Sequence, residues 1–263
     1  MAAKITWGIT FLVTGLLIGV RVPAVADEAW DRAFEVLETY DWGSDRAPLQ
    51  ALDRAVSGAH GDEAAARQLE SRLVEALEAA TTRAAKDYLC RQLSLIGSAA
   101  CVPAVAELLA QDATSHMARY ALQRIPDPAA AAALREALSQ VEGNLKIGVI
   151  HSLGARRDGD SAATLIELLD AADQRVAAAA AAALGSIANP AAREALAEFQ
   201  QRAPQALQLA AADAYLACAE RLLAEGDRVQ ATAIYRALAT ADQPAHIRLA
   251  ATRGLLAATQ QTD

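Results

Sequence analysis

The fold of this 263-residue chain is decided by two segments, ALQRIPDPAA at residues 121–130 and ALGSIANPAA at residues 183–192. They match at most apolar and turn positions. Halfway between them stands SLGA at 152–155, so Gln123, Gly154 and Gly185 are equally spaced along the chain. A period of about 30 residues, with two helices in each unit, is typical of a solenoid.

The residues around these segments mark where the helices begin and end. Each unit closes a helix near a Leu-Gly pair, turns, and begins the next helix at a Pro or a polar cap, namely Pro103, Pro128, Ser161 and Pro190. Proline fits the first helical turn without losing a hydrogen bond, and we expect the glycines to provide left-handed caps. Ala and Leu dominate the 54% of apolar residues and aromatics are 4%, which favours closely packed helices over strands.

The same pattern extends toward both ends. We predict helices at 28–40, around Leu49–Val56, after an Asp62 cap, and up to Gly97. Residues 204–241 look like one tetratricopeptide hairpin. The predicted fold is therefore an all-α solenoid (α-α superhelix) of six or seven helical hairpins, forming one domain over residues 27–263.

Residues 1–26 have the pattern of a secretory signal peptide. Lys4 precedes an apolar stretch over 5–20, Pro23 interrupts it, and Ala24-Val25-Ala26 is the small-x-small pattern of a cleavage site. We expect cleavage after Ala26 and a periplasmic or secreted chain. The alternative is an uncleaved N-terminal anchor, since the apolar stretch is of marginal length for a membrane span.

One stretch carries a family resemblance, LIELLDAADQRVAAAAAAALGSIANPAAREALAE at 165–198. It resembles the short HEAT repeats named after phycobilisome lyases, with paired Leu, a turn Asp and Val-Arg; Ala177 departs from the usual Arg. The run from Cys90 to Asp160 is similar to exported bacterial HEAT-repeat proteins. The resemblance implies a solenoid in which turn Asp and Arg residues pair structurally, and it raises a bilin lyase as an alternative function.

The chain shows no pattern of a catalytic or cofactor site. Its four histidines lack metal-ligand spacing, and no nucleotide-binding glycine loop or hydrolase elbow occurs, so we predict no enzyme activity, no metal and no cofactor. The net charge of −8 without a basic run argues against nucleic acid as a partner. We expect each histidine to be an exposed helical residue.

Candidate partner-binding residues lie on helices expected to line the concave face. They are His116, Arg119, Tyr120, Lys146, His151, Arg156 and Arg157. A structural alternative places Tyr120 between repeats and pairs Arg119 with Asp112. For the charged run at 156–160, the alternative is a solvated turn between helices.

Two further features leave alternatives open. Cys90 and Cys101 could form a disulfide across a helical hairpin, whereas burial as small apolar residues is favoured for these two and for Cys218. Trp42, beside a Gly turn, could be an exposed contact residue, whereas a plug at the open end of the first repeat is favoured.

A solenoid presents a long, rigid face suited to a protein or peptide. The predicted function is therefore a non-catalytic, exported scaffold for protein–protein interaction. The alternatives are a non-catalytic accessory subunit of a secreted hydrolase or redox protein, an enzyme in its own right, and a structural envelope protein.

Overall fold

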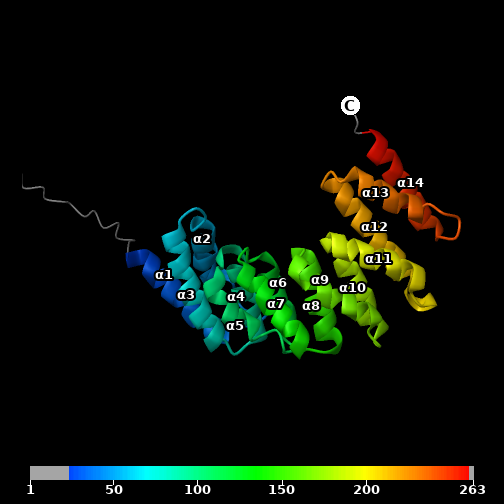
Figure 1. The fold of residues 1–263 in the computed structure, drawn as a ribbon. Coiled ribbons are helices and arrows are strands. Elements are labelled where there is room, and N and C mark those ends of the chain that lie inside the picture. The colour runs from blue at the N-terminus through cyan, green and yellow to red at the C-terminus, as the bar shows by residue number, and fades with distance from the viewer. Residues whose placement is uncertain (1–23, 261–263) are drawn as a thin grey trace, which may run out of the picture.

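The computed structural model describes the backbone of residues 24–260 and the side chains of residues 29–259. That part of the chain contains helices and no strand, which confirms the predicted all-α solenoid. Within it, seven helical hairpins follow one another in a curved stack (Figure 1). The predicted signal peptide, residues 1–26, lies outside the described residues except for its last three positions, which begin the first helix.

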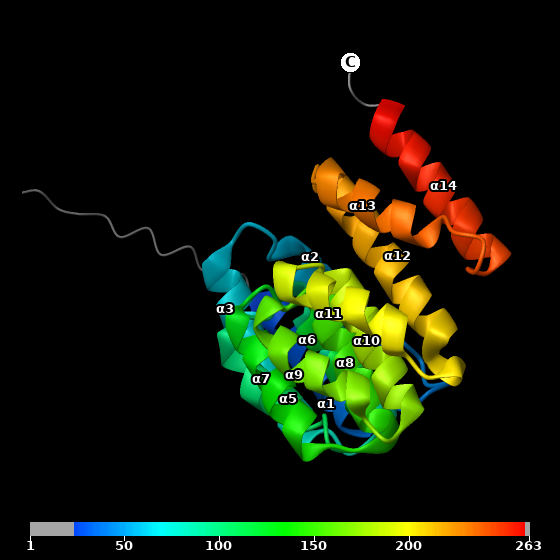
Figure 2. The same ribbon diagram turned by 45° about the vertical axis from the view of Figure 1, so that its right-hand side comes forward.

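The first helices of the hairpins form one row, here called the A row. They are α1 (Ala24–Thr39), α3 (Glu63–Ala79), α5 (Val102–Ala106), α7 (Pro128–Gln140), α9 (Ala162–Glu167), α11 (Pro190–Arg202) and α13 (Arg228–Leu238). The second helices form the B row. They are α2 (Gln50–Gly58), α4 (Arg83–Ile96), α6 (Ser115–Arg124), α8 (Gly143–Arg156), α10 (Gln174–Ile187), α12 (Gln208–Ala224) and α14 (Ala245–Gln260). Figure 2 separates the rows, with α5, α7 and α9 to the left of α6, α8 and α10.

Short 3-10 helices join or extend these elements. They are η1 (Ala47–Leu49), η2 (Ala99–Cys101), η3 (Gly159–Ser161), η4 (Leu168–Asp170) and η5 (Gln205–Leu207). Every B helix contacts the next B helix along the stack, from α2 to α14. The B row is therefore a continuous layer.

The two matching sequence segments have the same structural role. Asp127 and Asn189 are the N-cap residues of α7 and α11, and each is followed by a Pro in the first turn. The Asp127 side chain accepts from the Ala129 N–H at 2.8 Å, and that of Asn189 from the Ala192 N–H at 2.8 Å. Each cap satisfies a backbone donor that the helix leaves unpaired, which explains why the two turns match.

The glycines do not act as predicted. Gly154 and Gly185 lie inside α8 and α10, and the left-handed caps are Arg157 and Ala188, with φ of 55° and 52°. A Cβ on Gly185 would lie 2.5 Å from the Ala214 carbonyl oxygen of the next B helix, and one on Gly154 would lie 2.8 Å from the Ala183 Cα. These glycines therefore let adjacent B helices touch backbone to backbone. Because the closer row of a curved stack lies on its inner side, the B row lines the concave face.

The core is a thin layer of Ala and Leu between the rows, and it includes the three cysteines as free, buried thiols. The turn between α12 and α13 has Gly226 at φ 87° and an Asp227 cap. Tyr235 packs against α14 at Gly254, where an added Cβ would collide with the ring.

The first repeat differs from expectation. Trp42 is 59% exposed, so it does not plug the first repeat; its ring lies instead beside the Arg83 guanidinium, with Cζ 5.4 Å from the ring centroid. At the other end of the described stack, α14 exposes Leu249 and Leu256.

Candidate functional site: the B face of α4, α6 and α8

Three neighbouring B helices present a basic and aromatic surface. Residues spaced by three or four positions lie on one side of a helix, and α4, α6 and α8 are in contact in that order. Here the B-face patch means six side chains brought together on these helices: Arg91, His116, Arg119, Tyr120, Arg124 and His151. Four of the seven sequence-predicted residues belong to it.

The centre of the patch is a tyrosine ring between two arginines. The Cζ atoms of Arg124 and Arg91 lie 3.7 Å and 5.2 Å from the centroid of the Tyr120 ring. Arg124 also donates to the Tyr120 carbonyl at 3.1 Å, and the Nε of Arg91 donates to Asp87 at 2.8 Å. Cation–π contacts hold both guanidinium groups against the ring. Tyr120 therefore contacts Arg91 of the neighbouring repeat, as its structural alternative expected, while remaining partly exposed.

Sequence reasoning missed Arg91 and Arg124. The signal for Arg124 is its spacing of four residues from Tyr120 on the same helix. The signal for Arg91 is that it precedes Tyr120 by almost one full repeat, which places it on the preceding B helix at a similar height.

Arg119 extends across the boundary between two repeats. Its guanidinium group lies over Gly148 of α8, where the lack of a side chain leaves room for it. A Cβ at position 148 would be only 2.6 Å from the Arg119 Cζ. Nη1 donates to the Gly148 carbonyl at 3.2 Å, whereas Nε is buried without a hydrogen-bond partner. No pair with Asp112 occurs within the described residues, so that expectation was wrong. Burial lowers the pKa of Arg119.

The two histidines of the patch lie one helical turn from this contact. His151 follows Gly148 by three residues, and His116 precedes Arg119 by three; both are exposed. Partial burial and, second, the positive charge of Arg119 lower the pKa of His151. The lowered pKa favours the uncharged imidazole at neutral pH, and protonation at lower pH makes His151 a second cation beside Arg119.

The other three predicted residues are placed elsewhere. Lys146 lies five residues before His151, which rotates it by about 140° around α8, away from the patch. Arg156 donates to the carbonyls of Leu122 and Ile125 at the end of α6 and of Asp127 beyond it. Arg157 is exposed as the left-handed cap of α8.

The charged turn at 156–160 is not simply solvated, as its structural alternative supposed. The Asp158 side chain is only 9% exposed and pairs with Arg135 of α7 at 2.6 Å. Because Arg156 and Asp158 both connect one repeat to its neighbour, this turn is mainly a structural joint.

The charge of the B face changes along the stack. None of the ion pairs found within residues 24–260 involves Arg119, Arg124, His116 or His151. On α10 the solvent-accessible B-face positions are small, with Ala182 and Ser186, and on α12 they include Asp213 and Glu220. In a chain with net charge −8, the basic groups of the patch on α6 and α8 are thus without an ion pair in the described part of the chain, whereas Arg91 on α4 is paired with Asp87.

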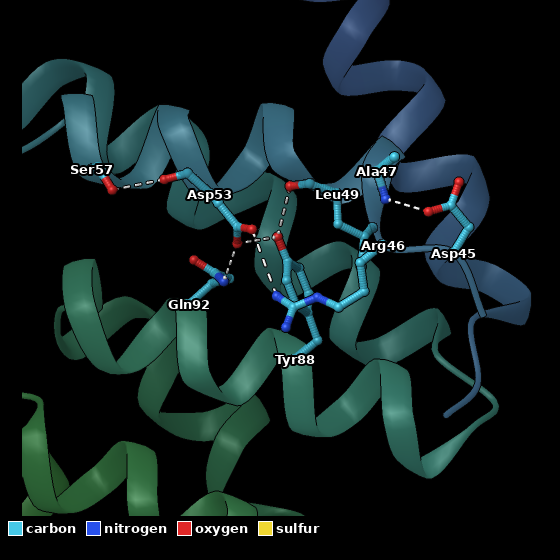
Figure 3. A network of polar contacts seen from close by, with 8 residues as sticks. All are labelled: Asp45, Arg46, Ala47, Leu49, Asp53, Ser57, Tyr88 and Gln92. Carbon is cyan, nitrogen blue, oxygen red and sulfur yellow. Dashed lines mark hydrogen bonds and ion pairs between the residues drawn. The ribbon is translucent and has the colours of Figure 1, made fainter. Parts of the chain in front are cut away.

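A polar network beside the patch joins α2 to α4 (Figure 3). Asp53 accepts from the Tyr88 hydroxyl and the Gln92 amide, both at 3.0 Å, and Tyr88 also donates to the Leu49 carbonyl at 3.2 Å. Arg46 lies 3.6 Å from the Asp53 carboxylate. Burial, followed by the charge of Asp53, raises the pKa of Tyr88, so the hydroxyl keeps its proton. The network holds two repeats together and offers no nucleophile.

Cavities elsewhere are shallow. The groove between α1 and α3 has a volume of about 390 Å³ and is lined by Phe34 and several carboxylates, with Arg72 across it. The part of the chain that the structure describes has no group of three His, Cys, Asp or Glu side chains that could hold a metal. None of its helices has the length and apolarity needed to cross a bilayer.

Comparisons with known proteins give only remote structural likenesses. No family model matches the chain, and no curated protein matches it. Similar solved structures include the complex of CpcE and CpcF of phycocyanin lyase from Nostoc sp. PCC7120, with 22% identity and a TM-score of 0.41 over 88% of each chain. One engineered protein shows 19% identity and a TM-score of 0.41, over 72% of this chain and 96% of its own. A second engineered protein shows 20% identity and a TM-score of 0.44, over 86% of this chain and 67% of its own. Likenesses at this level say nothing about what this chain binds or catalyses.

Proposed function

We propose that this chain is an exported, non-catalytic scaffold that binds a protein or peptide on the B face of α4, α6 and α8. The observation that carries the proposal is the contact of the partly exposed Tyr120 ring with the exposed Arg91 and Arg124. Tyrosine and arginine are enriched among the residues that dominate binding energy at protein interfaces. Here they are pre-ordered by each other, so little side-chain entropy is lost when a partner covers them.

The surroundings of this contact favour a macromolecular partner. Leu95, at the end of α4, is 67% exposed. The contact itself rests on the continuous B row, which is rigid and open rather than enclosed. A small molecule needs a concavity that covers most of its surface, whereas a protein segment can lie across several parallel helices. Export is supported by the signal-peptide pattern of residues 1–26.

The test is a selection of binding peptides from a random library on the full-length chain, followed by affinity measurement on the double variant Arg91→Gln, Arg124→Gln. We expect selected peptides to lose at least about tenfold in affinity, the effect of removing one interface hot spot. Arg236→Gln, an exposed arginine on α13 in the A row, is the matched control and should retain full binding. Peptides that bind the double variant as tightly as the unchanged chain contradict the proposed site.

A further inference from the structure

Arg119 has hydrogen-bonding capacity that the chain does not use. Nη1 is occupied by the Gly148 carbonyl, and Nε is buried without a partner. Nη2 makes no hydrogen bond within residues 24–260 and, unlike Nε, is not fully buried, so it can donate to a group outside the chain. A guanidinium fixed in this way, without a carboxylate beside it, is a preformed donor for an anion.

His151 provides the second donor. It lies one turn after Gly148 on α8, close enough to Arg119 for that charge to affect its titration. The solvent-accessible B-face positions of the neighbouring helix α10 are uncharged near it, with Ala178 and Ala182. Arg175 lies two helical turns before Ala182 on α10 and is paired with Asp173 at 2.8 Å. The charged group that faces His151 is therefore Arg119.

Resting on the proposed function, we infer that the partner is an acidic peptide segment and that one of its carboxylates binds between Arg119 and His151. Two donors on adjacent helices match the two oxygens of a carboxylate. Further acidic groups of the segment would meet Arg124, and Arg91 through the donors that its ion pair with Asp87 leaves free. The acidic side chains Asp213 and Glu220 on α12 repel such a segment, so its negatively charged end lies toward α4.

This geometry makes binding depend on pH. A carboxylate beside His151 raises the pKa of that imidazole relative to the free chain, so binding takes up a proton. Affinity should therefore increase as the pH falls from about 8 through the range where His151 gains its proton. It should decrease again when the carboxylates of the ligand protonate near pH ~4.3.

The experiment measures the binding of a fluorescein-labelled octaglutamate peptide to the full-length chain by anisotropy at pH 5.5 and at pH 8. We expect tighter binding at the lower pH. Arg119→Gln should weaken binding about tenfold at pH 5.5, the loss expected for one charge-assisted hydrogen bond. His151→Gln should leave binding at pH 8 unchanged and remove most of the gain at pH 5.5.

Matched controls separate this site from general charge. His60→Gln, at an exposed position in the turn after α2, should keep the full pH dependence. Octaglutamine and octalysine peptides should not bind. The His151 variant changes an exposed side chain, so it keeps the test valid if Arg119→Gln alters the fold.

Three outcomes would overturn the inference. The first is octaglutamate binding that is equal in the unchanged chain and in both variants, or absent altogether. The second is tighter binding of a phosphoserine peptide than of its glutamate counterpart. The third is tighter binding of a single-stranded oligonucleotide through the same two residues. Peptides selected from the random library that still need Arg91 and Arg124 would leave the proposed function standing in each case.

Discussion

The guanidinium of Arg156 donates to the backbone carbonyl of Ile125 at 2.6 Å, one full repeat earlier in the chain. The same group donates to the Leu122 and Asp127 carbonyls. Carbonyls at the end of a helix have no partner within that helix, so Arg156 of one repeat caps α6 of the repeat before it. The sequence separation of Arg156 and Ile125 equals the repeat period, so this one side chain fixes the spacing of two units.

Replacing Arg156 should therefore destabilise the stack. We expect Arg156→Met, which keeps the apolar stem, to lower the free energy of unfolding by about 2–3 kcal/mol, because it leaves half-buried carbonyls unpaired. Urea denaturation monitored by circular dichroism measures the change. Arg157→Met, at the adjacent exposed position, should change stability by less than about 0.5 kcal/mol. Equal effects of the two substitutions would mean that the carbonyl contacts contribute nothing.

The glycines inside the B helices give a second prediction. A methyl group at position 185 would lie 2.5 Å from the Ala214 carbonyl oxygen, so α10 and α12 would have to separate. We expect Gly185→Ala to destabilise by about 1–3 kcal/mol, the cost of overpacking, although alanine is the better helix former. Thermal and urea unfolding would report the change.

Gly58 provides the matched control, since it is also helical and nothing lies within 4 Å of an added Cβ. Gly58→Ala should be neutral or stabilising by up to about 1 kcal/mol. Should Gly185→Ala also stabilise the chain, close contact between B-helix backbones would not be what requires glycine there.

A third prediction concerns the left-handed cap of α8. Arg157 has φ 55°, a conformation that costs about 1–2 kcal/mol for a residue with a Cβ. Glycine removes that strain but gives up about 0.5–1 kcal/mol through its freedom in the unfolded chain. Arg157→Gly should therefore raise the free energy of unfolding by about 0.5–1 kcal/mol. The reverse change at a glycine of the same hand, Gly226→Ala with φ 87°, should lower stability by about 1 kcal/mol. The prediction fails unless the changes in unfolding free energy measured for Arg157→Gly and Gly226→Ala have opposite signs.

The sequence predicted the helices and their period well, because both depend on local chemistry. The Asp127 and Asn189 caps, each followed by proline, mark helix starts in any context. The roles predicted for Gly154 and Gly185 were wrong, because a glycine after a leucine is as compatible with a helix cap as with a contact point between helices. Only the position of the neighbouring helix distinguishes the two, and that position is set by packing between one repeat and the next.

The candidate site was partly predictable, because the positions of residues along a helix follow from the sequence alone. His116, Arg119 and Tyr120 were found from their position on one B helix, and His151 from the next. Arg91 and Arg124 were missed, because an arginine on a predicted helix is usually solvated and only the approach of a ring across the repeat singles it out. Lys146 was included because it shares a B helix with His151, whereas helix rotation separates the two. Arg156 was included as part of a charged run, whereas its guanidinium caps α6.

The last prediction concerns alkaline pH. Burial raises the pKa of the Cys90 and Cys101 thiols to about 12 and that of the Cys218 thiol to about 11. In the unfolded chain a cysteine titrates near pH ~8.5. A raised native pKa means that the folded state keeps protons that the unfolded state loses. The stabilisation is therefore complete below pH ~8.5 and is lost as the pH rises toward the native values.

Between about pH 9 and 11 each buried thiol should thus lower the free energy of unfolding by about 1.4 kcal/mol per pH unit. Cys90→Ala removes one of these contributions, so its stability should fall less steeply with pH than that of the unchanged chain, whatever the cost of the lost sulfur at neutral pH. Urea denaturation at several pH values in the presence of reductant gives both slopes. If the slopes are identical, Cys90 either ionises in the folded chain as readily as in the unfolded one or is not buried in solution. Slow reaction of the native chain with a thiol reagent separates these two cases, because a buried thiol is protected whatever its pKa.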